Sequence, residues 1–274
     1  MDAIETNFGT ATARHPVVPL AEWTARRKKL LLQEKAFTRM RDRLSAERRE
    51  LPWVKVEKNY VFDGSDGPES LADLFAGRSQ LLIKHFMFGP GWKEGCVGCS
   101  FESDHLEAAR VHLEHHDVTV VAVSRAPRSE FEPFQKRMGW RFKWVSSHGN
   151  DFNYDYHVSF TPEEVAAGRA YYNYAESEIP ADELSGFSVF YKNDAGEIYH
   201  TYSTFGRGAE ELMGTYVVLD MTPRGRNETG PNHNLTDWVR HHDCYEDGGF
   251  VDATGRYRPE NRSGTCCGDK EARA

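Results

Sequence analysis

The hydrophobic pattern changes along the chain and first predicts a long helix. Between residues 20 and 51, large apolar side chains recur every seven positions: Trp23, Leu30, Phe37 and Leu44. This spacing places them on one face of a helix, and Pro52 ends the pattern. We expect an amphipathic helix that packs on the core or on a second subunit.

The middle of the chain alternates between two kinds of pattern. Residues 79–88 and 117–126 are short runs that are apolar on both faces, as buried parallel strands are. Residues 99–116 and 127–140 are typical of helices, and residues 142–147 predict a further short strand. The order β-α-β-α-β predicts an α/β fold whose sheet begins parallel, with right-handed crossovers.

The pattern is interrupted after this core. Residues 148–180 are rich in Tyr and Asn and contain one clear helix start, a capping box of Thr161 and Glu164. We interpret them as an insertion. Two strands around the turn at residues 193–196 predict a β-hairpin. A last core helix is expected at residues 207–220 and a helical patch at 235–242.

These patterns divide the chain into four parts. We expect a loose tail at residues 1–18 and a helical extension that packs on the core at 19–66. The core domain spans 67–222 and includes the insertion, and 223–274 form a C-terminal extension and tail.

Charge and composition narrow the function. The net charge is −8, which argues against general affinity for nucleic acid. No segment approaches the ~20 apolar residues of a membrane span, and the first twenty residues lack the apolar core of a secretory signal. The five cysteines are few and odd in number for a secreted disulfide framework. We therefore expect a cytoplasmic protein without nucleic-acid or membrane partners.

The candidate chemistry lies where the first buried strand gives way to a helix. Cys96 and Cys99 are separated by two residues, after the loop Gly89-Pro90-Gly91. A cysteine at the first turn of a helix is favoured as the thiolate by free N–H groups and the helix dipole, and one turn on a second sulfur lies within disulfide reach. Gly98 leaves space for a partner's sulfur, and Trp92 is placed to wall one side of the site.

Two other interpretations stay open. The pair could hold zinc, which needs two further ligands. Candidates for these ligands are Cys244, Cys266, Cys267, His233, His241 and His242. The pair could also be buried and inert, but the Gly-Pro-Gly loop and its polar surroundings favour exposure. The strand–helix context favours redox chemistry over both.

The chain resembles a known family across residues 15–246. The segments "KHFMFGPGWKEGCVGCSFESD", "FSVFYKNDAGEIYHTYSTFGRGAEELMGTYVVLDMTPRGRNE" and "DWVRHHDCY" are similar to a bacterial family of uncharacterised thioredoxin-like proteins described as predicted dithiol–disulfide oxidoreductases. The resemblance implies a thioredoxin-like fold, with Cys96 as the exposed nucleophile and Cys99 as the resolving cysteine. It also implies that the end of the hairpin, with His200 and Arg207, lies near the site, where either side chain would favour the thiolate.

One position departs from the thioredoxin pattern. Thioredoxins have a cis-proline before the hairpin strand, whereas this chain has Leu184-Ser185-Gly186 there, and the nearest proline is Pro180. Because that proline shapes the substrate groove and keeps metals off the cysteines, its absence leaves the zinc alternative open.

The sequence thus predicts a thiol–disulfide oxidoreductase that uses no cofactor and no metal. A nucleotide fingerprint is absent from the sequence. The expected partners are a protein or small-molecule disulfide and an unidentified electron donor, and the prediction leaves homo-oligomer formation open. The alternatives are a thiol peroxidase and a non-catalytic protein whose cysteine pair holds zinc or an iron–sulfur centre.

Overall fold

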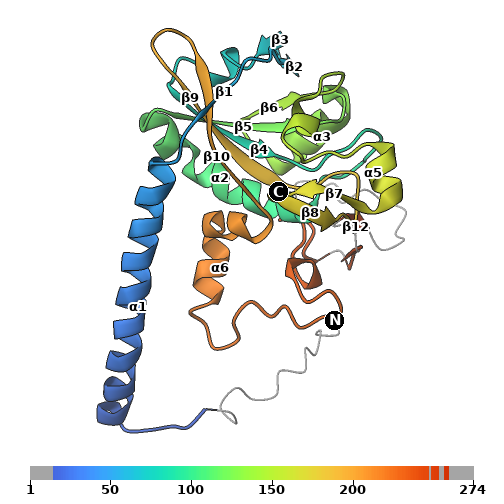
Figure 1. Ribbon diagram of the computed structural model, residues 1–274. Helices are drawn as coiled ribbons and strands as arrows, with labels where there is room; N and C mark the ends of the chain where they lie inside the picture. The colour runs from blue at the N-terminus through green and yellow to red at the C-terminus, as the bar shows by residue number, and fades with distance from the viewer. Residues whose placement is uncertain (1–14, 247, 253–255, 259–274) are drawn as a thin grey trace, which may run out of the picture. The chain divides into compact units, whose positions relative to one another are not determined.

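The structure is a computed structural model that describes residues 15–246, 248–252 and 256–258. The chain separates into two compact units (Figure 1). One contains helix α1 (Leu20–Arg49) together with Leu219–Gly225. This helix has almost the bounds that the seven-residue repeat predicts. Its expected packing on the core or on a second subunit stays a prediction.

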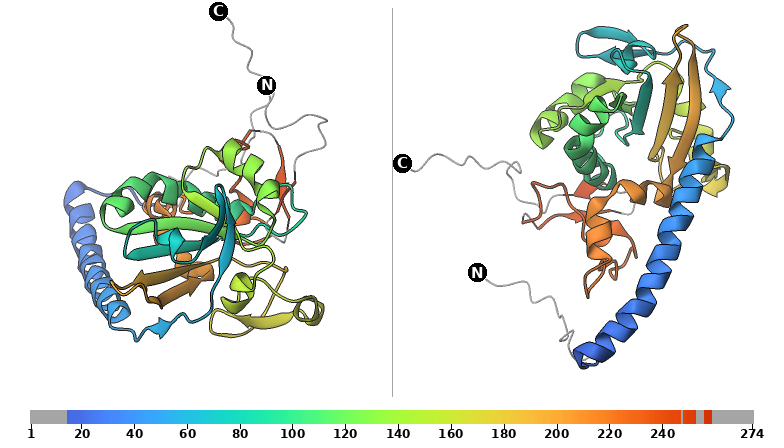
Figure 2. Two further views of the ribbon diagram at one scale, coloured as in Figure 1. Left: turned by 90° about the horizontal axis from the view of Figure 1, so that it is seen from above. Right: turned by 90° about the vertical axis from the view of Figure 1, so that its left-hand side faces the viewer.

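The second unit, Trp53–Val218 with the chain from Arg226 onward, is built on an eight-stranded sheet. The strand order is β1-β10-β9-β4-β5-β6-β2-β3, with the β9–β10 hairpin beside β4 (Figures 1 and 2). The bounds are β1 (Val54–Lys55), β2 (Val61–Gly64), β3 (Gly67–Ser70), β4 (Gln80–His85), β5 (Val118–Ser124), β6 (Lys143–Ser146), β9 (Gly186–Lys192) and β10 (Ile198–Phe205).

The centre of this sheet has the predicted topology. Strands β4, β5 and β6 are parallel, and β9 and β10 are antiparallel to their neighbours. Helix α2 (Val97–His115) connects β4 to β5, and α3 (Arg128–Met138) connects β5 to β6. The chain therefore has the expected α/β fold of thioredoxin-like type, with the cysteine pair at the junction of β4 and α2.

Successive residues of β4 are buried on opposite faces of the sheet, as strand geometry requires. On one face, Leu81 and Ile83 join a cluster with Phe62, Phe75 and Phe152. On the other face, a second cluster of aromatic side chains surrounds the two cysteines: Phe86, Phe88, Phe131, Phe134, Trp140 and Trp144. The two cysteines therefore lie against an apolar, largely aromatic part of the core.

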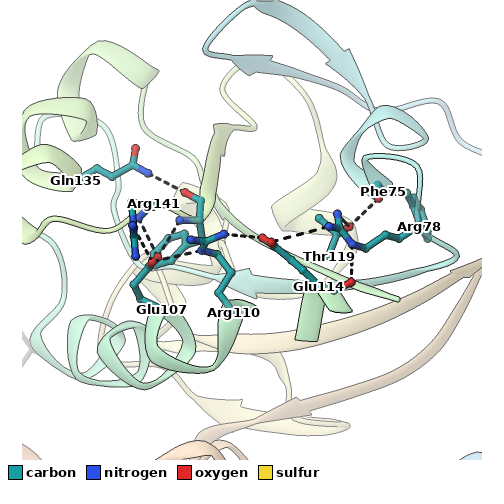
Figure 3. Close-up of polar contacts among 9 residues, drawn as sticks. Phe75, Arg78, Glu107, Arg110, Glu114, Thr119, Gln135 and Arg141 are labelled. Carbon is teal, nitrogen blue, oxygen red and sulfur yellow. Dashed lines mark hydrogen bonds and ion pairs between the residues drawn. The ribbon is translucent and has the colours of Figure 1, made fainter. Parts of the chain in front are cut away.

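Helix α2 is fixed to its surroundings by a network on its outer side (Figure 3). The carboxylate of Glu107 accepts hydrogen bonds from the backbone N–H groups of Arg141 (2.8 Å) and Phe142 (2.9 Å). Arg110 donates to Glu114 at 2.8 Å, and Arg78 donates to the Glu114 carbonyl at 3.0 Å. These bonds hold the helix that carries the cysteines in one position.

The insertion forms small elements of its own. It contains α4 (Phe152–Asp155), α5 (Pro162–Ala167) and a hairpin of β7 (Arg169–Tyr172) and β8 (Ala175–Glu178). The capping box of Thr161 and Glu164 at the start of α5 is confirmed.

Several boundaries differ from the sequence prediction. Strands β1 and β2 belong to the large sheet, although residues 19–66 were expected to be a helical extension. The expected helix at 207–220 is a 3₁₀ segment η3 (Gly206–Leu212) followed by α6 (Gly214–Leu219). Glycines at positions 206, 208 and 214 explain this break, because glycine is a poor helix former.

The remaining elements are short. They are the 3₁₀ turns η2 (Asp73–Phe75) and η4 (Leu235–Asp237) and the strands β11 (Phe250–Val251) and β12 (Tyr257–Arg258). The turn η4 is all that forms of the helical patch expected at residues 235–242. Within the described ranges, no helix combines the length and apolarity that crossing a membrane requires.

Candidate active site

The two cysteines occupy the first turn of α2, where the sequence placed them. Cys96 is the N-cap residue, and its Sγ accepts a hydrogen bond from the Cys99 backbone N–H at 3.5 Å. The Cys99 Sγ accepts from the Met87 N–H at 3.4 Å. Both cysteines are free thiols in this structure. One otherwise unpaired N–H group of the helix start, that of Cys99, is thus directed at a sulfur, and a second N–H comes from the segment after β4.

The loop before Cys96 requires a glycine at position 95. A Cβ there would lie 2.7 Å from ring carbons of both Phe86 and Phe134. The backbone of the loop therefore packs directly on the aromatic cluster. Gly91, with φ of +80°, makes the preceding turn in the left-handed region.

The two thiols differ electrostatically. A hydrogen bond from the Cys99 thiol lowers the pKa of Cys96 against the opposing effect of burial, and the Cys99 N–H and the charge of Lys84 lower it further. Burial raises the pKa of Cys99 well above its usual range, and the adjacent Cys96 sulfur adds to this rise. Cys96 is therefore the more acidic thiol of the pair, and Cys99 is the hydrogen-bond donor to it.

A buried ion pair lies beside the sulfurs. Lys84 on β4 is 1% exposed and pairs with Glu102 on α2, with its Nζ 4.3 Å from the centre of the Phe187 ring. Burial opposes the charge on Lys84, but the Cys99 sulfur and Glu102 outweigh it and raise the pKa of the lysine. Lys84 is thus a permanent cation next to both cysteines.

The site opens into a cavity of about 510 Å³, which we call the thiol cavity. Its walls include Cys96, Cys99, Glu102, Tyr172, Arg207 and Leu235. The expectation that the cysteines are exposed is wrong in one respect. Cys96 is 7% exposed and Cys99 is 1% exposed, so access to the sulfur runs through this cavity.

The C-terminal extension explains this burial. Arg256 forms a β-bridge with Cys96, and its guanidinium lies 3.9 Å from the centre of the Trp92 ring. His241 is fully buried and hydrogen-bonds through Nε2 to the Gly95 carbonyl at 3.0 Å. Burial lowers the pKa of His241 to about 4, so it is neutral at pH 7 and donates to that carbonyl. Residues far along the chain therefore cover and anchor the cysteine loop.

Trp92 and Gly98 lie close to the cysteines, as predicted. Trp92 is packed in the same buried cluster as Cys96 and lies under Arg256 rather than on the cavity wall. Gly98 lines the cavity, and a Cβ there would lie 3.4 Å from a methyl carbon of Leu235, an ordinary contact.

The other two predicted site residues, Arg207 and His200, lie at two different cavities. Arg207 lines the thiol cavity, but its side chain is 86% exposed and pairs with Glu210 at 2.7 Å. His200 lines a different cavity and bonds to Ser203 there. The cation that acts on Cys96 is Lys84, so any role of Arg207 or His200 in favouring the thiolate stays a prediction.

The zinc interpretation gains no further ligand among the described residues, where no three His, Cys, Asp or Glu side chains are grouped as a metal site would require. His241 is used by the cysteine loop, and His242 bonds to Asp104 at 2.8 Å. Cys244 is buried and donates to Asp243. Cys266 and Cys267 lie outside the described residues.

Sequence reasoning missed Lys84 and Glu102 as parts of this site, and it named His241 only as a possible zinc ligand. The signal for Lys84 was a charged residue within an apolar strand, which needs a buried counter-charge. Glu102 follows Cys99 by three residues on a helix and thus shares its face. For His241 the only signal was its place in a polar segment.

Comparison with solved structures gives weak likenesses at low identity. The chain is similar to peroxidoxin BcpB from Mycobacterium tuberculosis, with 10% identity, 60% of this chain and 95% of that chain covered, and a TM-score of 0.40. It is also similar to PrxQ from Xylella fastidiosa (14% identity, 61% and 94% covered, TM-score 0.39). A third similar structure is a putative thiol:disulfide interchange protein DsbE from Chlorobium tepidum. It has 13% identity, 61% of this chain and 97% of that chain are covered, and the TM-score is 0.36. These values are too low to carry an argument about chemistry.

A search of curated proteins found no match. One family model, in contrast, matches residues 12–245 and so covers most of the chain. The match includes the cysteine pair and Cys244. The protein therefore belongs to the family described as bacterial proteins of unknown function, DUF899.

Proposed function

We propose that the protein is a thiol–disulfide oxidoreductase in which Cys96 attacks and Cys99 resolves. One observation carries the proposal: the Cys96 sulfur faces a cavity while it accepts the Cys99 N–H and lies in the field of buried Lys84. Each of these interactions favours the thiolate, which is the nucleophile in disulfide exchange.

The reaction proceeds in two exchanges. The Cys96 thiolate attacks one sulfur of a substrate disulfide, forms a mixed disulfide and releases the other sulfur as a thiolate. The Cys99 sulfur then attacks Cys96, which forms the Cys96–Cys99 disulfide and releases the second substrate thiolate. The substrate gains two electrons and the cysteine pair loses two. A dithiol donor, the second partner that we propose, reduces the pair again.

The second exchange requires a proton acceptor, because burial keeps Cys99 protonated. Glu102 is placed for this role: it lines the thiol cavity and lies one turn after Cys99 on α2. Its carboxylate pairs with Lys84. In the mixed disulfide the Cys96 sulfur carries no charge, and as the Cys99 sulfur attacks it the Glu102 carboxylate accepts the Cys99 proton while the substrate leaves as the thiolate.

The burial of Cys96 restricts the substrate. A cysteine residue that is 7% exposed at the wall of a cavity is open to a small disulfide or an extended peptide segment, and closed to a flat protein surface. We propose that the substrate is of this small or extended kind, and that the reaction takes place in the cytoplasm, where disulfides are turned over rather than stored.

The proposal is tested by trapping the mixed disulfide with hydroxyethyl disulfide. Cys99→Ser should accumulate one adduct on Cys96, identified by peptide mass spectrometry, because the resolving sulfur is missing. Cys244→Ser is the matched control, since Cys244 is also a buried free thiol. It should behave as the wild type and form the Cys96–Cys99 disulfide.

Two results would refute the proposal. One is an outcome in which Cys99→Ser forms no adduct on Cys96 while Cys96→Ser forms one on Cys99. The other is stoichiometric zinc or iron in the purified protein that survives dialysis and blocks thiol labelling, which would support the metal alternative.

A further inference from the structure

A second cavity of about 400 Å³ lies in the same unit, and its walls include residues of the insertion and of β10. Aromatic side chains form a large part of its wall, and we call it the aromatic cavity: Tyr60, Tyr156, Tyr171, Tyr174, His200 and Phe205. Its volume lies in the range of about 300–1,000 Å³ typical of small-molecule sites. None of these residues takes part in the proposed thiol chemistry.

Three of the seven described non-glycine residues with positive φ line this cavity. His157, Asn173 and Tyr174 line it, and all three have positive φ, at 55°, 53° and 66°. For residues other than glycine, such conformations cost about 1–3 kcal/mol each and cluster at ligand sites. Two of these residues form the turn of the β7–β8 hairpin, and its tip is therefore held against the cavity in a strained conformation.

A chain of hydrogen bonds leads from the cavity into the sheet. His200 Nε2 bonds to Ser203 Oγ at 2.7 Å, Ser203 to Ser188 at 2.7 Å, and Ser188 to His85 Nε2 at 2.7 Å. His200 Nε2 also lies 3.1 Å from the carbonyl of Tyr202. A carbonyl only accepts, so we assign the proton to His200 Nε2, which places Ser203 Oγ as an acceptor from His200.

This assignment determines what His200 offers the cavity. Burial lowers the pKa of His200, so the ring is neutral at pH 7. With the proton on Nε2, Nδ1 has a free lone pair, and no hydrogen-bond partner for it is found among the described residues. Because His200 is one of the lining residues, Nδ1 is the acceptor that this side chain can offer to a hydroxyl donor in the cavity.

The charged residues at the rim neutralise each other. Lys55 pairs with Glu197, and Lys58 pairs with Asp155 at 2.7 Å, while Asp155 also accepts from the Tyr60 hydroxyl. The paired lysines thus leave no free cation at these positions to attract an anionic ligand, and the remaining charged side chain of the wall, Glu57, is exposed to solvent and lies in the field of Lys55. A neutral ligand fits this rim best.

We propose that the aromatic cavity binds a neutral planar aromatic alcohol, with its ring among the tyrosines and its hydroxyl donating to His200 Nδ1. Aromatic rings pack favourably against one another in offset or edge-to-face arrangements. The hydroxyl satisfies the one acceptor that the protein leaves unpaired on His200. This site is separate from the thiol cavity, and it does not depend on the proposed redox function.

Isothermal titration calorimetry with 2-naphthol tests the site. We expect saturable binding at one site per chain. Its methyl ether, 2-methoxynaphthalene, has the same rings and no donor, so it should bind about tenfold more weakly, the value of one hydrogen bond. His200→Phe keeps an aromatic ring and should weaken 2-naphthol about tenfold, while it leaves the ether unchanged.

Two further variants keep the test independent of folding defects. Tyr171 is 40% exposed, so Tyr171→Ala should fold and should weaken both ligands. Cys96→Ser is the matched control in the other cavity and should bind as the wild type. The proposal is overturned if 2-naphthol shows no saturable binding, if the ether binds equally well, or if benzyltrimethylammonium binds more tightly than 2-naphthol.

Discussion

Lys84 and His85 are neighbours on β4, and each is 1% exposed, yet their pKa values are shifted in opposite directions. Lys84 points to the cysteine side and is paired with Glu102. His85 points to the other side, where it meets Ser188 and the rings of Phe152 and Tyr156. The pKa of Lys84 is raised, whereas that of His85 falls from 6.5 to about 3.

The difference shows that burial alone does not decide charge. Burial is the largest effect on both groups, and in both it disfavours the charged form. Lys84 stays charged because a carboxylate and a sulfur surround it, while His85 meets hydroxyls and aromatic rings and becomes neutral. The same strand therefore supports a charged thiol cavity on one face and a neutral region on the other.

The largest expected effect comes from Lys84→Met. This change leaves Glu102 buried without its partner, and we expect the free energy of unfolding to fall by about 3–5 kcal/mol, as when one half of a buried ion pair is removed. Urea unfolding at pH 7 measures it. The double variant Lys84→Met/Glu102→Gln should recover much of the loss. A loss below about 1 kcal/mol in the single variant would contradict the pairing.

His85→Phe should have a smaller effect, of about 1–3 kcal/mol, because it leaves the buried Ser188 hydroxyl without one partner. It should also change the pH dependence of stability. Because the pKa of His85 is lower in the folded state than in the unfolded state, its contribution is complete above pH 6.5 and is lost as the pH falls from 6.5 to about 3. The variant should lose less stability across this window.

Measurement of this difference uses urea unfolding of both proteins between pH 7 and pH 4. His241 contributes in the same direction through its lowered pKa, but it does so in both proteins, so it cancels in the comparison. Equal slopes in the two proteins would mean that His85 is protonated in the folded state, and the contrast with Lys84 would then fail.

The smallest effect is expected for Gly98→Ala, within about 0.5 kcal/mol of the wild type. The added Cβ would make only an ordinary contact with Leu235. Gly95→Ala is the matched control and should cost about 1–3 kcal/mol, because its Cβ would collide with two rings. Thermal unfolding compares them. If Gly98→Ala lowered the stability as much as Gly95→Ala, the helix start would be tightly packed at position 98. The conclusion that a Cβ there makes only an ordinary contact would then be wrong.

The local features of the fold were predictable from sequence because local chemistry determines them. The capping box at Thr161 and the position of Cys96 at a helix start follow from residues within one turn. The β9–β10 hairpin follows from its turn residues in the same way.

The burial of the cysteines was not predictable, because it depends on residues far away in the sequence. Leu235 and Arg256, which lie against the loop, follow Cys96 by well over one hundred residues. The role of Lys84 was hidden for a similar reason, since its partner Glu102 lies on the next element. The position of His200 depends on an irregularity of β10 between His200 and Tyr202, for which the alternating pattern gives no signal.

The central claim, that Cys96 is the more acidic thiol of the pair, is tested most directly by its alkylation. The rate of reaction of Cys96 with iodoacetamide is measured against pH by peptide mass spectrometry in the wild type and in Lys84→Met. The account predicts a midpoint below about 8.5, the ordinary pKa of a cysteine, and a shift to higher pH when Lys84 is removed. A midpoint at or above that value, unchanged in the variant, would contradict the account.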